Sequence, residues 1–281
     1  MTLPDLVVTG STGRLGSRVA GLLAAAGVPQ RLLVRDESRA PRLPGAEVVQ
    51  ADYGDADAAL RALDGARTLF MVSAAEAADR LAQHRTFVEA ASRAGVERVV
   101  YTSFAGAAAD ATFTLARDHH ATEEMLTESP MAWTALRDSL YLDFLPLMVG
   151  ADGVIRGPAG GGRVAAVAIA DLAEVAATVL QHPGDHEGAV YVLTGPKALT
   201  LDEVAAQVGA ATGRQVRYER ETVEEAYASR AHYGAPAWQL DAWVSTYTAI
   251  AAGEMAEVSD HIEQVTGHPA TSLAQLLDVA H

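Results

Sequence analysis

The stretch Leu6-Val7-Val8-Thr9-Gly10-Ser11-Thr12-Gly13-Arg14-Leu15-Gly16 decides the fold of this chain of 281 residues. Its apolar start predicts a strand that ends at a glycine-rich turn, and a helical pattern follows directly and closes at Gly27. A strand, a tight turn and the first turn of a helix place free backbone N–H donors where a phosphate group can bind. The spacing Gly-x-x-Gly-x-x-Gly therefore predicts dinucleotide binding, with a plain strand–loop–helix of another α/β protein as the alternative.

Each glycine of this loop has a separate expected role. Gly10 makes the sharp exit from the strand, and Gly13 lets the backbone approach a pyrophosphate because a Cβ there would collide with it. Gly16 lets the helix pack closely against the sheet. The predicted cofactor contacts in the loop are Gly10, Ser11, Thr12, Gly13, Arg14, Leu15 and Gly16.

The end of the second predicted strand, which begins at Gln30, indicates which cofactor is bound. Arg35 ends this strand and Arg14 lies in the glycine loop, and two guanidinium groups suit the 2′-phosphate of NADP. Asp36 comes one residue late for the ribose contact typical of NAD sites, so NAD stays open. We favour NADP, with Arg35 as a solvated charge at a strand end as the alternative.

Further strands over 47–50, 68–72 and 97–102 alternate with helical patterns and short connections. This alternation predicts an α/β fold with a Rossmann-type, doubly wound parallel sheet, in which ligands bind at the carboxyl ends of the strands. Asp52 comes after one such strand and is expected to accept a hydrogen bond from adenine or to cap the next helix. The cofactor candidates at these strand ends are Asp52, Ser73, Ala74 and Ser103.

The second half of the chain is predicted to be a smaller, mainly helical lobe that contributes to the substrate pocket. Residues 150–162 are rich in glycine and predict a loop or hairpin, and residues 164–169 predict a strand. Asp171 is expected to cap the helix that follows. We therefore predict a dinucleotide-binding domain over 1–150 and a lobe over 151–281 that is not an independent domain.

Composition narrows the function classes. The net charge of −15 argues against non-specific nucleic-acid binding, which needs basic surface. The chain contains no cysteine, no signal-peptide pattern and no long uninterrupted apolar stretch, so we expect a cytoplasmic protein that does not enter a membrane. The nine histidines show no metal-ligand spacing, so we expect no metal.

Several further motifs give the chain a family resemblance over nearly its whole length. The chain resembles atypical short-chain dehydrogenase/reductases of the NmrA-like group and, within that group, is similar to NAD(P)H-dependent quinone oxidoreductases. The motifs are the glycine loop, Leu33-Val34-Arg35-Asp36, His119-x-x-Thr122-Glu123-x-x-Leu126, Trp133-Thr134-Ala135-Leu136-Arg137, Ala170-Asp171-Leu172-Ala173, Tyr191-Val192-Leu193-Thr194-Gly195-Pro196 and Leu201-x-Glu203-Val204-Ala205.

One departure from the superfamily puts the chemistry in doubt. Typical members carry Tyr-x-x-x-Lys on the helix that contains His119, with Tyr as proton donor, whereas the two positions here are Leu115 and His119. We expect His119 to handle the proton and to contact the cofactor, with a helix-surface histidine as the alternative. Glu123 is expected to face the same side and orient His119, or to be solvated. His120 is expected to be a surface residue.

The resemblance places the substrate region after the sixth strand of the sheet. Tyr141 and Phe144 are expected either to line a pocket for a flat ligand or to pack on the sheet, and Phe104 and Ala105 complete the substrate candidates. The leading hypothesis is hydride transfer between a nicotinamide and a small quinone or aromatic carbonyl compound. The alternatives are a dinucleotide-sensing regulator without turnover and a tailoring redox enzyme for polycyclic aromatic compounds, in which oxygen is one conceivable acceptor. A homodimer is left open.

Overall fold

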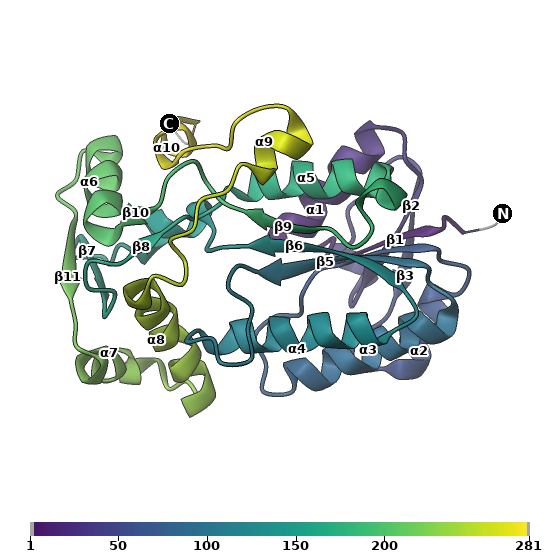
Figure 1. Ribbon diagram of the computed structural model, residues 1–281, viewed down its shortest axis with the longest axis horizontal. Coiled ribbons are helices and arrows are strands. Elements are labelled where there is room, and N and C mark those ends of the chain that lie inside the picture. The colour runs from purple at the N-terminus through teal and green to yellow at the C-terminus, as the bar shows by residue number, and fades with distance from the viewer. Residues whose placement is uncertain (1–2, 280–281) are drawn as a thin grey trace. The chain divides into compact units, whose positions relative to one another are not determined.

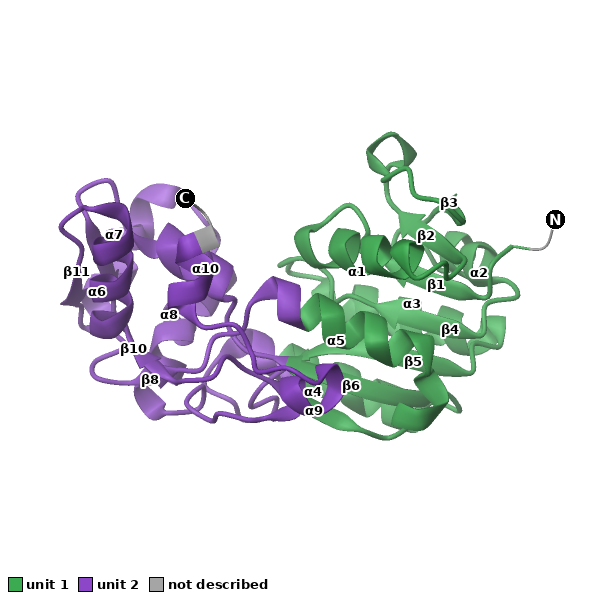
Figure 2. Cartoon of the chain, turned by 90° about the horizontal axis from the view of Figure 1, so that it is seen from above, with its two compact units in different colours: residues 1–103, 118–137, 172–191 green, residues 104–117, 138–171, 192–281 purple. Residues whose placement is uncertain are grey.

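The computed structural model describes residues 3–279, which form two compact units (Figure 2). Unit 1 comprises the residues up to Ser103 together with Asp118–Arg137 and Leu172–Tyr191, and unit 2 comprises Phe104–Arg117, Asp138–Asp171 and the chain from Val192 onwards. The chain therefore does not divide at residue 150 as predicted. The segments that leave the sheet after its fifth and sixth strands are long enough to pack in unit 2 before the chain returns to unit 1.

The largest sheet has the predicted Rossmann-type topology. Its strand order is β3-β2-β1-β4-β5-β6-β9, and the pairs β1–β2, β1–β4, β2–β3 and β4–β5 are all parallel. Because parallel strands end at one edge, the residues that follow β1, β2, β4 and β5 lie together there. The strands are β1 (Leu6–Thr9), β2 (Gln30–Val34), β3 (Ala46–Gln50), β4 (Thr68–Met71), β5 (Arg98–Phe104), β6 (Ala132–Asp138) and β9 (Val190–Leu193).

Helices cover both faces of this sheet (Figure 1). Helix α1 (Arg14–Ala25) and helix α5 (Ile169–Gln181) lie on one face, and α2 (Ala56–Leu63), α3 (Arg80–Ala94) and α4 (Thr114–Glu128) lie on the other. The apolar core of unit 1 forms because the strands are buried between the two layers. Its largest fully buried side chains include Tyr101, Phe70, Phe87, Leu63, Leu69, Met71 and Leu126.

The ends of the helices on this sheet follow local sequence signals. Asp55 caps α2, because its Oδ1 accepts a hydrogen bond from the Ala58 backbone N–H at 2.9 Å. The Asp52 carboxylate instead accepts from the Gly54 backbone N–H, so Asp52 does not cap the helix. Gly95 ends α3 in the left-handed conformation with φ of 81°.

The start of α5 differs from the prediction. The helix begins at Ile169 rather than after Asp171, and the Ile169 N–H donates to the Asp143 carboxylate at 2.9 Å. Asp171 lies in the first turn, where its carboxylate accepts from the backbone N–H of Thr271 at 2.6 Å and from the Thr271 hydroxyl at 2.7 Å. The predicted strand over 164–169 shortens accordingly to β8 (Arg163–Val164).

Unit 2 contains two small sheets and its own apolar core. The predicted loop over 150–162 contains strand β7 (Val154–Gly157), which pairs in parallel with β11 (Arg217–Arg220), and β10 (Leu199–Thr200) pairs antiparallel with β8. The other elements are α6 (Leu201–Thr212), α7 (Val223–Arg230), α8 (Ala237–Ala252), α9 (His261–Thr266), α10 (Leu273–Val279) and 3₁₀ helices η1 (Glu37–Arg39), η2 (Leu142–Met148), η3 (Pro183–His186) and η4 (Ala231–Tyr233). Among the helices of residues 3–279, none has the length and apolar character needed to cross a bilayer.

Replacing Gly16 by Ala is expected to lower the free energy of unfolding. A Cβ at Gly16 would lie 2.3 Å from the Gly10 carbonyl oxygen and 2.8 Å from the Thr9 carbonyl oxygen, and neither backbone atom can move cheaply. We expect a loss of about 1–3 kcal/mol in urea unfolding. The matched control is Gly21→Ala in the same helix, where a Cβ meets nothing within 4 Å and a gain of about 0.5–1 kcal/mol is expected. Equal effects of the two substitutions would contradict the close packing of α1 on β1.

Candidate active site

The glycine loop makes a tight turn between β1 and α1. Gly10 has φ of +64°, and a Cβ there would lie 3.0 Å from the Val72 side chain, so the position favours glycine on two grounds. The Gly13 N–H donates to the Gly10 carbonyl at 2.8 Å, which closes the turn. Leu15 and Gly16 are buried, and they can meet a ligand only through the backbone.

No side chain of residues 3–279 caps the start of α1 from its N-cap position. Gly13 occupies the N-cap position and has no side chain to accept from the first turn, and that turn contains no acidic residue. The positive end of the helix dipole is therefore not neutralised locally. The hydroxyl of Ser11 is buried and has no hydrogen-bond partner within residues 3–279. These groups fit the phosphate oxygens of a dinucleotide.

The two arginines predicted to read a 2′-phosphate lie after β1 and at the end of β2. Arg14 and Arg35 are exposed, as is Thr12. The Asp36 carboxylate instead caps η1, because it accepts from the Ser38 hydroxyl at 2.6 Å and the Ser38 N–H at 3.0 Å. These two hydrogen bonds lower the pKa of Asp36, which keeps it ionised and held within its own turn.

The segment after β4 is held by three side chains. The Ser73 N–H donates to Thr102 Oγ1 at 2.8 Å, and the Ala74 N–H donates to His84 Nε2 at 2.9 Å. The Ala74 carbonyl accepts from Arg80 Nε at 2.9 Å. The predicted cofactor residues Ser73 and Ala74 therefore have a fixed backbone at the carboxyl edge of the sheet.

His84 is a buried, neutral histidine with a defined tautomer. Its Nε2 accepts from Ala74, so Nδ1 carries the proton and donates to Thr122 Oγ1 at 2.8 Å, while the Thr122 hydroxyl donates to the Asp118 carbonyl. Burial, and then the charge of Arg80, lower the pKa of His84 to about 3. The His84 side chain thus holds the backbone of Ala74 without carrying a charge near neutral pH.

His119 is also buried, and both of its ring nitrogens have a partner. Its Nε2 lies 3.1 Å from Arg80 Nη2 and its Nδ1 lies 3.0 Å from the Tyr101 hydroxyl. Since a guanidinium only donates, Nε2 accepts and Nδ1 carries the proton. Burial, and then Arg80 and His84, hold the pKa of His119 well below its usual value. This burial shows that the alternative of a helix-surface histidine is wrong, while the proton-handling role of His119 stays a prediction.

Glu123 does not contact His119 in the way that helical spacing predicts. Its Oε1 accepts from the Ser103 hydroxyl at 2.6 Å and from Arg137 Nε at 2.9 Å, and its Oε2 accepts from Arg137 Nη2 at 2.5 Å. The Glu123 side chain is only 7% exposed, so this is a largely buried bidentate ion pair. Glu123 therefore orients Ser103 and Arg137. His120 is half-buried and lies 3.5 Å from Glu124.

The predicted substrate residues lie in unit 2. Phe104 and Ala105 are buried, and Phe104 packs on Phe113 with ring centroids 4.9 Å apart. The Tyr141 hydroxyl donates to the Asp138 carboxylate at 2.8 Å, and burial, followed by the charge of Asp138, raises the pKa of Tyr141 well above its usual value. Phe144 is 41% exposed at the start of η2, 5.6 Å from the Tyr141 ring. Tyr141 and Phe144 thus form one aromatic pair.

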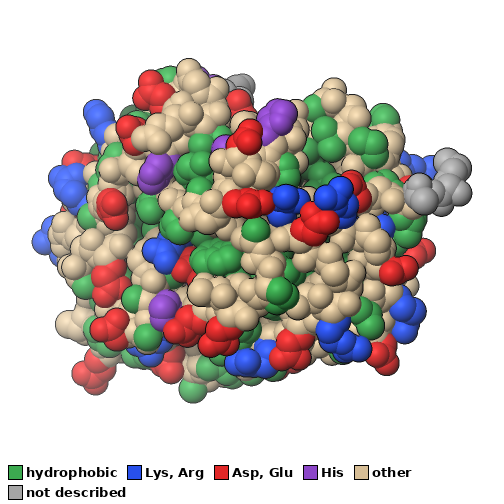
Figure 3. Space-filling view, turned by 45° about the vertical axis from the view of Figure 1, so that its right-hand side comes forward, with side chains coloured by type: hydrophobic (Ala, Val, Ile, Leu, Met, Phe, Trp, Pro, Cys, Tyr) green, Lys and Arg blue, Asp and Glu red, His purple; other side chains and the backbone are tan. Residues whose placement is uncertain are grey.

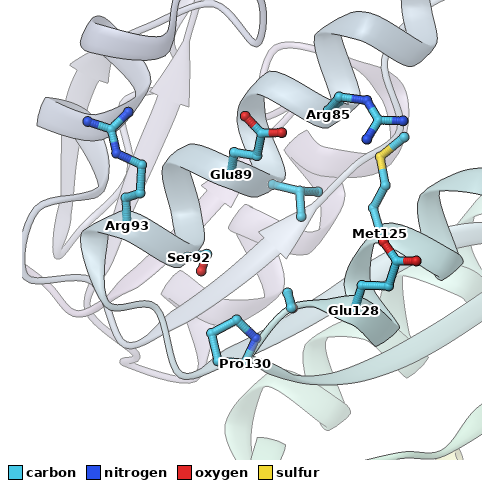
Figure 4. A pocket seen from close by; sticks show the side chains of 9 residues that line it. Arg85, Glu89, Ser92, Arg93, Met125, Glu128 and Pro130 are labelled. Carbon is cyan, nitrogen blue, oxygen red and sulfur yellow. The ribbon is translucent and has the colours of Figure 1, made fainter.

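A cavity of about 360 Å³ lies between α3 and α4 in unit 1 (Figure 4). It is lined near the C-terminal ends of the two helices, by Ser92 and Arg93 among others from α3 and by Glu128 from α4. Because α3 leads into the amino end of β5, this cavity is at the opposite edge of the sheet from the glycine loop. It contains none of the predicted site residues. Within residues 3–279 no three His, Asp or Glu side chains gather as a metal site would need.

Sequence reasoning did not find four of the residues that organise this site. Arg80 and His84 come from α3, Tyr101 comes from β5 and Arg137 comes from β6. The only signal for the α3 pair was a charged and a polar residue four positions apart on a helix, which ordinarily indicates a solvated face. Here both are buried, with exposed fractions of 3% and 0%.

Comparison with known proteins shows that the chain belongs to the NmrA-like family, whose model matches residues 4–275. Quinone oxidoreductase 2 of Escherichia coli (strain K12) is 35% identical over 277 residues, 96% of each chain, and an NAD(P)H azoreductase of Xenophilus azovorans is 34% identical over 275 residues, again 96% of each. The crystal structure of Escherichia coli NADPH-dependent quinone oxidoreductase QOR2 complexed with NADPH matches with a TM-score of 0.89 at 34% identity, covering 98% of this chain and 99% of that one. Citrobacter sp. triphenylmethane reductase complexed with NADP(H) matches with a TM-score of 0.87 at 31% identity, over 98% and 100%.

Acidification is expected to destabilise the fold through His84. A histidine whose pKa is lowered in the folded state binds fewer protons than it does in the unfolded chain, so its stabilisation is complete above about pH 6.5 and is lost as the pH falls towards 3. Between pH 7 and pH 5 we expect His84 to lower the free energy of unfolding by about 2 kcal/mol, with His119 acting in the same direction. Urea unfolding at the two pH values measures this. If the free energy of unfolding of a His84→Gln variant falls between pH 7 and pH 5 by as much as that of the wild type, the role of His84 is contradicted.

Replacing Glu123 by Gln is expected to lower stability more than catalysis. The substitution leaves the Arg137 guanidinium, whose side chain is 25% exposed, without its counter-charge, and we expect a loss of about 3 kcal/mol. For the folded enzyme, kcat should stay within about tenfold, because removal of a true proton donor costs roughly 10²–10⁴-fold. The control is Glu124→Gln, whose side chain is 63% exposed and which should change stability by at most about 0.5 kcal/mol. A large loss of kcat without a loss of stability would restore Glu123 as a catalytic residue.

Proposed function

We propose that this chain is an NAD(P)H-dependent oxidoreductase that reduces a small, flat, conjugated acceptor, with a quinone as the leading substrate class. The observation that carries the proposal is the uncapped start of α1, where backbone donors and the unpartnered Ser11 hydroxyl surround the glycine turn. Family membership over residues 4–275 and relatives that are quinone and azo reductases support it.

The cofactor is proposed to lie along the carboxyl edge of the sheet in unit 1. The loop Gly10–Gly16 would hold the pyrophosphate, and the fixed backbone of Ser73 and Ala74 would border the nicotinamide half. Asp52, Ser103 and His119 complete the proposed contacts, although Ser103 and His119 are buried and bear on the cofactor through the surfaces that they support. When bound, the reduced nicotinamide supplies a hydride.

The protein's own groups define which acceptors suit this site. His119 is neutral, and the Ser103 hydroxyl is committed to Glu123, so neither is poised to protonate an alkoxide. A plain ketone needs such an acid, whereas a quinone spreads the incoming charge over an aromatic ring. The dye classes named for the relatives, azo compounds and triphenylmethanes, are likewise conjugated electrophiles. The proposed substrate side is the aromatic pair Tyr141 and Phe144 with Phe104 and Ala105.

A second function is favoured by one observation. The position of the expected phenol is Leu115, which packs against the apolar core of unit 2, and the position of the expected lysine is His119. A regulator that senses a dinucleotide without turnover needs neither group. NADPH oxidation with a panel of quinones separates the two functions. No turnover with any acceptor, combined with tight NADPH binding, would favour the regulator.

The remaining partner assignments stay predictions. Acidic and basic side chains are intermingled on the face seen in Figure 3, and the net charge of −15 still argues against nucleic acid as a ligand. We retain a cytoplasmic location, the absence of a metal and a homodimer as proposals. Size-exclusion chromatography with light scattering measures the oligomeric state.

Replacing Arg35 by Ala is expected to weaken NADPH binding far more than NADH binding. Arg35 is exposed at the end of β2, while the acidic neighbour Asp36 is held by Ser38. Loss of a charge-assisted contact to a phosphate costs about 1.5–3 kcal/mol, which corresponds to roughly 10–100-fold in Kd for NADPH. Fluorescence titration with both cofactors measures the ratio. Arg18→Ala on the exposed face of α1 is the control, and equal weakening of NADPH and NADH by Arg35→Ala would contradict the NADP preference.

A further inference from the structure

We propose that Arg80 is a positioning residue of the hydride-transfer site, because its guanidinium joins the Ala74 carbonyl and the His119 ring into one fixed unit. The inference rests on the proposed function. It adds Arg80, a residue that is named neither in the glycine-loop motif nor in the motifs of the family resemblance. All the groups involved lie in unit 1.

Arg80 is buried far more deeply than an ordinary ion-pair arginine. Its side chain is 4% exposed, although it lies in the first turn of α3, and its partner Asp118 is 27% exposed. Burying a guanidinium is costly unless its donors are used. Here Nε donates to the Ala74 carbonyl at 2.9 Å, Nη1 to Asp118 at 3.1 Å and Nη2 to His119 at 3.1 Å. All three nitrogens of the planar fork are therefore engaged, in three different directions.

The contact with Ala74 fixes the segment after β4. The backbone N–H of the same residue, Ala74, donates to Nε2 of His84, which lies one helical turn after Arg80 on α3. Two side chains of α3 thus clamp one residue at the carboxyl edge of the sheet, where a bound dinucleotide must pass. Arg80 supplies the half of this clamp that neutral His84 cannot supply, since a carbonyl oxygen needs a donor.

The contact with His119 fixes its tautomer. The groups facing the ring are Arg80 and His84 from α3, and Tyr101 and the Thr102 backbone from β5, with Asp118 adjacent on α4 itself. None of the α3 and β5 groups is an anion that would favour an imidazolium, and Arg80 opposes it directly. With His119 at the lysine position of the superfamily motif, Arg80 is the cation that contacts this position.

The test compares Arg80→Lys and Arg80→Gln in the full chain, with Arg85→Gln as the matched control on the exposed face of α3. Lysine keeps the charge and loses the planar fork, whereas glutamine loses both. We expect both Arg80 variants to raise the Kd for NADPH by about tenfold or more, because at least one charge-assisted hydrogen bond of the clamp is lost. Arg85→Gln should leave the Kd unchanged.

The second readout is the ¹⁵N shifts of the His119 ring, followed by NMR over about pH 5–8, the range in which an ordinary histidine titrates. We expect no titration in the wild type and in Arg80→Lys, with Nε2 unprotonated, and a rise in the His119 pKa in Arg80→Gln. A wild-type His119 that titrates in this range, or an Arg80→Gln variant that binds NADPH like the wild type, overturns the proposal. If Arg80→Gln does not fold, the wild-type titration and the Kd of Arg80→Lys still decide it.

These outcomes are separable from failure of the proposed function. Absence of quinone turnover with intact NADPH binding would remove the reductase assignment, and the two Kd values and the His119 titration would still test the clamp. Wild-type turnover accompanied by unchanged binding in both Arg80 variants would remove the clamp and leave the reductase assignment standing.

Discussion

The buried guanidinium of Arg80 is the interaction on which the arrangement at the carboxyl edge of the sheet depends. A buried cation must use its donors, and those of Arg80 reach a backbone carbonyl after β4, a carboxylate on α4 and the ring of His119. Burial, and then the same charge, lower the pKa of both His84 and His119. The histidines around Arg80 are therefore expected to stay uncharged near neutral pH and not to titrate there.

The glycine loop and this network have different proposed roles, phosphate binding for the loop and selection of the acceptor for the network. The loop is proposed to hold the phosphates, because Gly10, Gly13 and Gly16 present only backbone and the buried Ser11 hydroxyl has no partner within residues 3–279. Selectivity for the acceptor is then proposed to depend on buried side chains that are not available as proton donors. Glu123 ties up Ser103, and Arg80 ties up His119, so the available chemistry is hydride transfer to an electrophile that accommodates the charge itself. The fold alone would not have implied this.

The sequence was sufficient for those parts of the fold that local chemistry determines. The strand–turn–helix at Gly10 follows from nearby residues, and the structure confirms it, whereas the cap of α2 is Asp55 and not Asp52. The predicted start of α5 was wrong because the Asp171 carboxylate accepts hydrogen bonds from Thr271, one hundred positions away in the chain. The strand β7 was missed because its only β partner in the described structure, β11, is also distant in the chain and its glycine-rich sequence indicates a loop or hairpin.

The candidate site shows the same limit more sharply. Helical spacing correctly placed His119 and Glu123 on one helix, but it could not show that α3 supplies an arginine to the first, while β5 and β6 supply a hydroxyl and a guanidinium to the second. Whether a protein group donates a proton during hydride transfer is measured most directly by the single-turnover rate of NADPH oxidation by a quinone between about pH 6 and 8, where an ordinary histidine titrates. A rate constant independent of pH is predicted, because no protein group gives up a proton in the hydride step. A rate that falls as the pH rises through this range would show that an ionising acid takes part, and would contradict it.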